Sequence, residues 1–146
     1  MAAESLARTL YHLLDAHRVD DAVDCLAADF RGHGLGSNRA GFRAEAAALI
    51  AAFPDLSITL RRLVTDGSSV AAWIGLRGTH RGRFAGLSPT ARPIDIVGAD
   101  LLIERDGRFV EAWGLRDLNT LWIQLGALPG SAPDNREHTQ QRSANR

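Results

Sequence analysis

Two carboxylates stand in rows of apolar side chains, where a charged group is costly to bury. Side chains alternate between the two faces of a strand. In residues 94–104 this alternation puts Asp100 on one face with aliphatic neighbours, and in residues 109–117 it puts Asp117 at the end of a row containing Trp113. A buried carboxylate must be paired, hydrogen-bonded or protonated, and such groups often serve as acids or bases. The two aspartates therefore predict an interior cavity with acid/base capacity.

Each aspartate also has a structural interpretation. Asp117 precedes Leu118-Asn119-Thr120 and could cap a helix that starts there, because Asp is a favoured N-cap residue. Asp100 could instead form an ion pair across the sheet with one of four arginines, namely Arg61, Arg62, Arg77 and Arg116. Ion pairs also perturb pKa values, so neither interpretation excludes a catalytic role.

Two histidines and two tryptophans complete the set of candidate site residues. His33 lies between glycines, where the backbone can approach a ligand closely, and is either a catalytic donor or an exposed turn residue. His80 ends an apolar strand face and is expected in the core or at the rim of a pocket, within reach of a substrate. Trp73 and Trp113 lie mid-strand and are expected to hold a flat ligand, although most such tryptophans belong to the core or an interface.

Several kinds of chemistry are excluded or disfavoured by residue type. The 17 basic residues are all arginine, so a lysine Schiff base is impossible. Cys25 is the single cysteine, and no pair of histidines has metal-ligand spacing. A dinucleotide fingerprint, a phosphate-binding loop and a nucleophile elbow are all missing from the sequence. We therefore expect an enzyme without a metal or a cofactor.

The charge balance and the hydropathy narrow the class of partner. The 17 basic residues are matched by 17 acidic ones, so the net charge is zero, which argues against binding to nucleic acid. No apolar run approaches the ~20 residues of a membrane span, and the N-terminus does not look like a signal peptide. A single cysteine fits a cytoplasmic protein. The expected partner is a small molecule.

The elements that must position these residues follow from hydrophobic periodicity. Apolar spacing predicts helices over residues 5–17, 20–28 and from 37 or 38 to 53, and a last helix from 118 to about 126. After Pro54 the period changes to two, and Asp66-Gly67 and Asp106-Gly107 predict hairpins. The result is an α+β fold with a curved antiparallel sheet, helices over one face and a cavity between. One domain is expected over residues 1–128, followed by a polar, disordered tail over 129–146.

An ordered set of short motifs resembles the SnoaL-like polyketide cyclases over roughly residues 5–128. The motifs, in chain order, are Ala52-Phe53-Pro54-Asp55-Leu56, Gly78-Thr79-His80-Arg81-Gly82, Ser88-Pro89-Thr90, Asp106-Gly107, Val110-Glu111-Ala112-Trp113, Asp117 and Gln124-Leu125-Gly126. The resemblance implies a cone-shaped barrel like those of ketosteroid isomerase and nuclear transport factor 2. It also implies dimers or tetramers formed through the outer face of the sheet.

The resemblance also implies roles for the two aspartates. The family's general acid/base is an aspartate near the end of the last long strand, and Asp117 matches its position. A second polar residue on the preceding strand, often histidine, corresponds most nearly to Asp100. The leading hypothesis is a cofactor-independent cyclase or isomerase that closes a ring in a polyketide-like intermediate by aldol chemistry, with Asp117 as the base and a protonated Asp100 or His33 as the polarising donor. The alternatives are a hydroxylase on the same scaffold and a non-catalytic binding or dimerisation module.

Overall fold

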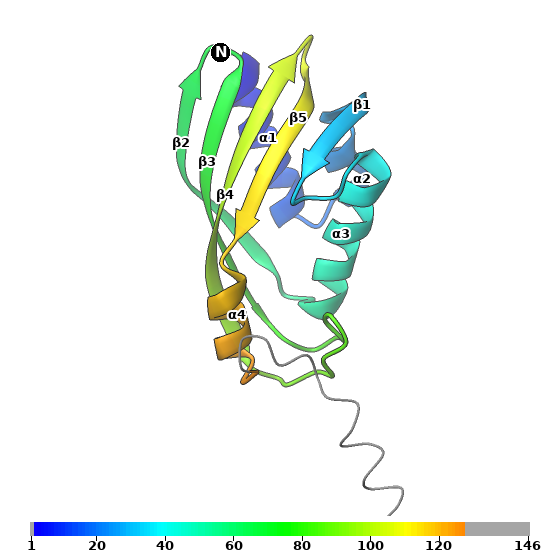
Figure 1. The fold of residues 1–146 in the computed structure, drawn as a ribbon, viewed down its shortest axis with the longest axis vertical. Coiled ribbons are helices and arrows are strands. Elements are labelled where there is room, and N and C mark those ends of the chain that lie inside the picture. Colours follow the sequence, from blue (N-terminus) through cyan, green and yellow to red (C-terminus); the bar gives the residue numbers. More distant parts are fainter. Residues whose placement is uncertain (1, 128–146) are drawn as a thin grey trace, which may run out of the picture.

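The computed structural model describes residues 2–127, which form one curved sheet with the N-terminal helices packed against its inner face and a short C-terminal helix at one end (Figure 1). The elements in chain order are α1 (Ala2–Asp15), α2 (Val19–Val23), β1 (Leu26–His33), α3 (Arg39–Ala52), β2 (Ser57–Asp66), β3 (Ser69–Thr79), β4 (Pro93–Arg105), β5 (Arg108–Arg116) and α4 (Leu118–Gln124). This confirms the predicted α+β class. The predicted tail over 129–146 lies outside the described residues.

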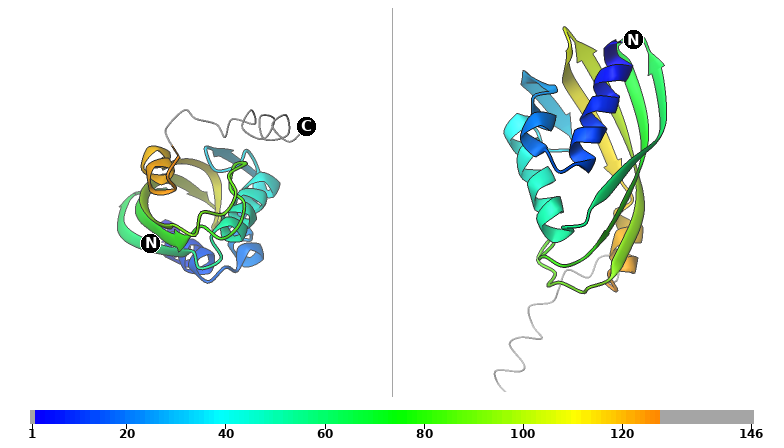
Figure 2. Two further views of the ribbon diagram at one scale, coloured as in Figure 1. Left: turned by 90° about the horizontal axis from the view of Figure 1, so that it is seen from below. Right: turned by 180° about the vertical axis from the view of Figure 1, so that it is seen from behind.

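The strands are ordered β1-β5-β4-β3-β2 in the sheet. Neighbours pair antiparallel except for β1, which runs parallel to β5. Helix α1 packs across β2, β3 and β4, and α3 packs against β1. Figure 2 shows the sheet curving around these helices, which leaves one concave side that holds the core.

Two hairpins and one helix cap agree closely with the sequence. Asp106 and Gly107 both adopt positive φ, at 52° and 82°, as the tight turn between β4 and β5 requires. Gly67, also at positive φ, turns the chain between β2 and β3. The side chain of Asn38 caps α3 by accepting a hydrogen bond from the backbone N–H of Gly41 at 2.8 Å.

The N-terminal helices differ from the prediction. Helix α1 begins at Ala2, so Ser5 lies inside it and not at its cap. The helix expected over residues 20–28 is only one turn long, and strand β1 starts at Leu26. Leu26 pairs there with Phe109 of β5. A short helix has little stability of its own, so pairing with the edge of the sheet determines the structure of this segment.

Candidate active site

A cavity of about 580 Å³ lies between the inner face of the sheet and helix α3. Most of its wall is apolar and comes from α1, α3 and the sheet. The charged side chains on it are Arg116, from β5, and Glu45, from α3. Such a cavity has the size and the mainly apolar lining of a small-molecule site.

The cavity opens beside the end of β5. Strand β1 ends at His33, opposite Trp113, so the last residues of β5 form an edge of the sheet. The lining residues that are also exposed mark the opening, and they are Gly34, Glu45, Ala48, Leu115 and Leu118. A ligand would therefore pass between β5 and α3.

A buried cluster of three polar side chains, Tyr11, Asp100 and Arg116, reaches this cavity through Arg116, the one member that lines it. Asp100 is only 5% exposed and projects from the inner face of β4. Its Oδ1 accepts a hydrogen bond from Nη1 of Arg116 at 2.7 Å, and its Oδ2 accepts one from the hydroxyl of Tyr11 at 2.6 Å. Both oxygens of Asp100 therefore act as hydrogen-bond acceptors, whereas the sequence suggests Asp100 as a hydrogen-bond donor.

Tyr11 reaches Asp100 from helix α1 on the opposite side of the core. Burial raises the pKa of the Tyr11 hydroxyl well above its usual value, and the negative charge of Asp100 raises this pKa further. The phenol therefore remains a hydrogen-bond donor throughout the neutral pH range. It holds Asp100 from one side while Arg116 holds it from the other.

Glycines leave the space that this arrangement needs. Gly98 lies directly opposite Arg116 in the sheet. A Cβ at Gly98 would lie 2.8 Å from Cδ and 2.9 Å from Nη1 of Arg116. A Cβ at Gly114 would collide with the side chain of Leu35, which lines the cavity. Both glycines therefore allow a larger side chain to lie flat against the sheet.

The structure places Asp117 at the N-terminus of α4, where it caps the helix. The backbone N–H and the hydroxyl of Thr120 donate to its two carboxylate oxygens at 3.1 and 2.6 Å. These hydrogen bonds lower the pKa of Asp117. Neither Asp117 nor Asp100 is among the residues that line the cavity, although Arg116, which contacts Asp100 and precedes Asp117 in the chain, is.

A β-bulge in β5 reverses the alternation of faces that the sequence predicts for this strand. Ile103 of β4 pairs with Glu111, but the next residue, Glu104, pairs with Phe109, so Val110 is an extra residue in β5. Beyond the bulge the two faces exchange. The inner face carries Ala112, Gly114 and Arg116 in place of the predicted row of Trp113, Leu115 and Asp117.

The two tryptophans consequently lie outside the cavity, contrary to the expectation that they hold a ligand there. Trp73 is 46% exposed and Trp113 is 41% exposed, both on the outer face of the sheet. His33 is stacked on Trp113 with ring centroids 5.1 Å apart, and its Nε2 lies 2.9 Å from Oε2 of Glu111. His33 is exposed and therefore lies on the outer side of the cavity opening.

His80 is fully buried at the end of β3, which agrees with the core position expected for it. The backbone N–H of Thr90 donates to its Nδ1 at 3.1 Å, and the imidazole packs against the ring of Phe53. Burial lowers the pKa of His80, so the ring is neutral near pH 7. Phe53 also packs against Phe84, which lines the cavity. Phe53 therefore stands between His80 and that part of the wall.

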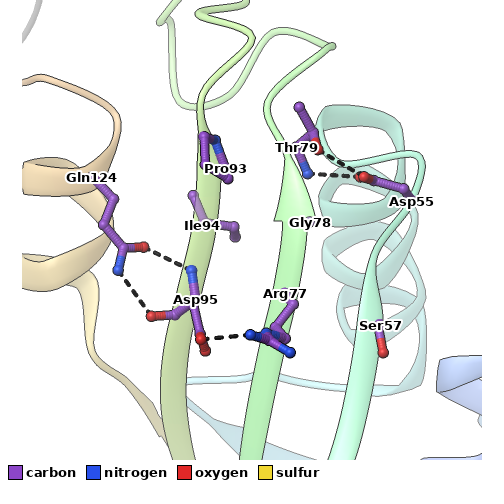
Figure 3. A pocket seen from close by; sticks show the side chains of 9 residues that line it. All are labelled: Asp55, Ser57, Arg77, Gly78, Thr79, Pro93, Ile94, Asp95 and Gln124. Carbon is purple, nitrogen blue, oxygen red and sulfur yellow. Dashed lines mark hydrogen bonds and ion pairs between the residues drawn. The ribbon is translucent and has the colours of Figure 1, made fainter.

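A second depression, of about 490 Å³, lies on the outer face of the sheet next to α4 (Figure 3). Its polar groups largely bind one another. Asp55 accepts hydrogen bonds from the backbone and the hydroxyl of Thr79, and the Gln124 side chain bridges the backbone of Asp95. Asp95 also pairs with Arg77 at 3.3 Å. These contacts join β3 to the segment before β2, β4 to α4, and β3 to β4.

Sequence reasoning missed Tyr11 and gave Arg116 only as one of four ion-pair candidates. Tyr11 follows Ala3 and Ala7 at intervals of four on the buried face of α1, so its polar tip was a signal of a partner in the core. The bulge at Val110 reverses the alternation of β5, so the sequence pattern does not place Arg116 on the inner face. Across residues 2–127 no group of three histidine, cysteine, aspartate or glutamate side chains is arranged to hold a metal ion. No helix in this range is long and apolar enough to span a membrane.

Comparison with known proteins supports a single family. The family model for the SnoaL-like polyketide cyclases matches residues 4–125. Among solved structures, IdmH, a proposed polyketide cyclase from Streptomyces antibioticus, is 28% identical over 86% of this chain and 99% of its own, with a TM-score of 0.74. TsrD from Streptomyces laurentii is 26% identical over 87% of this chain and 96% of its own, with a TM-score of 0.78.

A further structural match extends the fold comparison. AclR from Streptomyces galilaeus, a proposed hydroxylase, is 21% identical over 85% of this chain and 95% of its own, with a TM-score of 0.79. A search of curated proteins gives no match. The family model covers most of the chain and the cavity residues from Leu14 to Leu118. The chain therefore belongs to the SnoaL-like polyketide cyclase family.

Proposed function

We propose that this protein binds a polyketide-like small molecule in the cavity and closes a ring in it by aldol-type acid/base catalysis. The observation that carries the proposal is the buried Tyr11–Asp100–Arg116 cluster, whose guanidinium stands on an apolar cavity wall. Membership of the family and the likeness to IdmH support this class of substrate.

Arg116 supplies the electrophilic part of the proposed mechanism. Removal of a proton α to a carbonyl creates an enolate, whose oxygen carries negative charge. A fixed cation in a water-poor, apolar site stabilises such an oxyanion far more than water does. Arg116 is held in place for this purpose, because Asp100 and the backbone carbonyl of Leu115 both accept its Nη1 hydrogens.

We assign the proton transfer to Asp100. In the first step the α-carbon gives its proton to the Asp100 carboxylate, and the electron pair of the C–H bond forms the enolate. The enolate carbon then bonds to a second carbonyl carbon of the same molecule, and the resulting alkoxide takes the proton back from Asp100. No electrons are exchanged with an external reagent, so these steps require no cofactor.

Asp117, the residue that the family resemblance favours as the base, is the rival to Asp100. Thr120 stabilises the charged form of Asp117 and so makes it a weaker base, and its hydrogen bonds are those of a helix cap and involve no group on the cavity wall. The two carboxylates can be compared directly, because Asn is nearly isosteric with Asp and also caps helices well.

The test is mass spectrometry of the products formed from a panel of polyketide keto-esters, with and without oxygen. Wild type should give a product of unchanged mass, or one lighter by a water, equally well without oxygen. Asp100→Asn should abolish this conversion, and Asp117→Asn should retain most of it, with the fold of both variants checked by circular dichroism.

Other results would point to other functions. The reverse pattern between the two variants would move the acid/base role to Asp117. A product heavier by one oxygen atom and formed only in air would indicate a hydroxylase. Binding of keto-esters without conversion by wild type would favour a non-catalytic binding module.

The proposal also includes a homo-oligomer and a cytoplasmic location. The exposed residues Val64, Trp73, Leu101 and Trp113 make the outer face of the sheet apolar, as a surface that a second copy covers would be. Leu101 pairs with both Ala71 and Trp113 across the sheet, so this apolar surface is continuous. The single cysteine, Cys25, fits a reducing compartment.

A further inference from the structure

Arg116 has hydrogen-bond donors that the protein does not use. A guanidinium group carries five N–H donors. Nη1 uses two of them, donating to Oδ1 of Asp100 at 2.7 Å and to the carbonyl of Leu115 at 3.0 Å. Nη2 uses one, toward Oδ2 of Asp100 at 3.4 Å. Within residues 2–127, the Nε–H and the second Nη2–H have no acceptor.

The two unused donors lie on the same edge of the guanidinium. Nη1 is on the same side of the plane as Cδ, so Nε–H and the outer Nη2–H point in parallel from the opposite edge. The Cδ–Nη1 edge lies against Gly98, since a Cβ there would meet both atoms. The Nε–Nη2 edge therefore faces away from Gly98, on a side chain that lines the cavity and keeps 23% of its surface exposed.

Such an edge is a two-pronged donor for a planar pair of oxygens. Arginine binds carboxylates in this bidentate manner, whereas lysine offers a point charge without the planar geometry. The rest of the wall is mainly apolar, and its other charged member, Glu45, lies at the exposed opening. An anion inside the cavity has no comparable partner among the lining residues.

We propose that the Nε–Nη2 edge of Arg116 binds a planar anion with two oxygens, namely the enolate of a 1,3-dicarbonyl or a carboxylate of the substrate. This inference rests on the proposed function for the site and narrows its substrate class. In a 1,3-dicarbonyl the central carbon loses its proton to Asp100, and the electron pair spreads over both oxygens, one for each donor. That charge distribution makes the proton acidic enough for a carboxylate base to remove.

The test measures binding and does not depend on turnover. Three aryl probes of similar size are titrated into the protein, namely 1-phenyl-1,3-butanedione, 3-phenylpropanoate and 4-phenyl-2-butanone, which has one carbonyl. Calorimetry gives the affinities, and the ultraviolet absorption of the diketone enolate reports its apparent pKa when bound. The variants are Arg116→Lys, which keeps the charge beside Asp100 but loses the planar edge, and Arg105→Lys on the exposed end of β4 as the matched control.

Wild type should bind the diketone, the carboxylate or both at least about tenfold more tightly than the monoketone, as expected for an added charge-assisted hydrogen bond. Arg116→Lys should remove this preference and Arg105→Lys should keep it. A lowered apparent pKa of the bound diketone identifies the enolate as the ligand, and a preference for 3-phenylpropanoate alone identifies a substrate carboxylate.

Equal affinity for all three probes, binding of none, or a preference unchanged in Arg116→Lys would overturn the inference. These results remain distinct from a failure of the proposed function. A preference that depends on Arg116, without ring closure of any keto-ester, would support the oxygen-pair site and reject the cyclase. Ring closure that persists in Arg116→Lys would support the cyclase and reject this site.

Discussion

At the scale of single residues, the two aspartates are distinguished by their hydrogen-bond partners. Asp100 is buried and receives a phenol and a guanidinium from two other elements. Asp117 receives both of its donors from Thr120, three residues along the chain. The first arrangement fixes a charge beside a cavity, and the second fixes the start of a helix. Substitutions should therefore affect activity at one position and stability at the other.

Replacement of Asp117 tests its role as a helix cap. Asp117→Ala should lower the melting temperature at pH 7, because the first turn of α4 loses an acceptor, whereas Asp117→Asn should stay close to wild type. Since the folded state lowers the pKa of Asp117, its stabilising effect is present above the unfolded value of about 3.9 and is lost as the pH falls through the lower, folded value. The melting temperature of Asp117→Asn should accordingly fall less on acidification than that of wild type. Equal melting temperatures for Asp117→Ala and wild type would contradict the cap.

Tyr11 is the single tyrosine of the chain, so its ionisation can be followed without interference from another phenol. Burial and the charge of Asp100 raise its pKa, so its contribution to stability is complete below the unfolded value of about 10 and is lost as the pH rises through the folded value. Tyrosinate absorbance near 295 nm should therefore appear only when the protein unfolds in alkali.

Two variants test separately the raised pKa of Tyr11 and its hydrogen bond to Asp100. Asp100→Asn should bring the onset of ionisation to lower pH, because it removes the neighbouring negative charge. Tyr11→Phe should abolish the signal and reduce the free energy of unfolding by about 1–2 kcal/mol, since Oδ2 of Asp100 loses its hydroxyl donor. Ionisation of native Tyr11 near pH 10 would be incompatible with the hydrogen bond described here.

At the scale of elements, the predictable features are those that depend on local sequence. Asn38, Pro54 and the two Asp-Gly turns mark boundaries through backbone geometry, and each of them is found where the sequence places it. Strand β1 and the bulge at Val110 depend on pairing between segments about 80 residues apart or on the neighbouring strand, and no local pattern contains that information.

The bulge had the larger effect on the prediction of the site. Asp100 precedes it along the chain and was placed on the correct face, beside the aliphatic residues of β4. Every residue of β5 after Val110 was placed on the opposite face, because one extra residue reverses an alternation of period two. The sequence therefore predicts the cavity, but it does not predict that Arg116 lies on the cavity wall.

The space at Gly98 gives a prediction about the strands. Gly98→Ala introduces a methyl group against Cδ and Nη1 of Arg116 and against the backbone carbonyl oxygen of Leu115, so the guanidinium and the adjacent backbone of β5 must both shift. Turnover of a ring-closing substrate should be lost or strongly reduced, with a fall of about 1–3 kcal/mol in the free energy of unfolding. Steady-state kinetics and denaturant titration measure the two effects separately.

Gly75→Ala is the matched control for that substitution. Gly75 also lies in a strand beneath an arginine, but its contact is Arg61, an exposed side chain that can swing into solvent. This variant should keep wild-type activity. Equal losses of activity in both variants would mean that general disturbance of the sheet explains the result. A loss of activity in Gly98→Ala alone would assign the effect to Arg116 and the adjoining backbone of Leu115.

At the scale of the whole molecule, charge does not favour association with a polyanion, since acidic and basic residues are equal in number. The unusual feature of the surface is apolar. Leu101 and Trp113 are each 41% exposed and pair with one another across the outer face. Covering them with a second copy would remove them from water without closing the cavity, whose opening lies at the edge of the sheet between β5 and α3.

If two copies associate through the outer face of the sheet, a charged residue introduced there should lower the mass of the oligomer in solution. Leu101→Arg introduces a charge at the centre of the apolar surface, where an isologous contact would place two copies of the charge near each other. Sedimentation or light scattering should give a dimer or tetramer for wild type at micromolar concentration and a monomer for Leu101→Arg. Ile123→Arg, at an exposed apolar position on α4, is the control and should keep the wild-type mass. A monomeric wild type would reject association through this face, and a variant that becomes monomeric yet still closes rings would show that each cavity works within one chain.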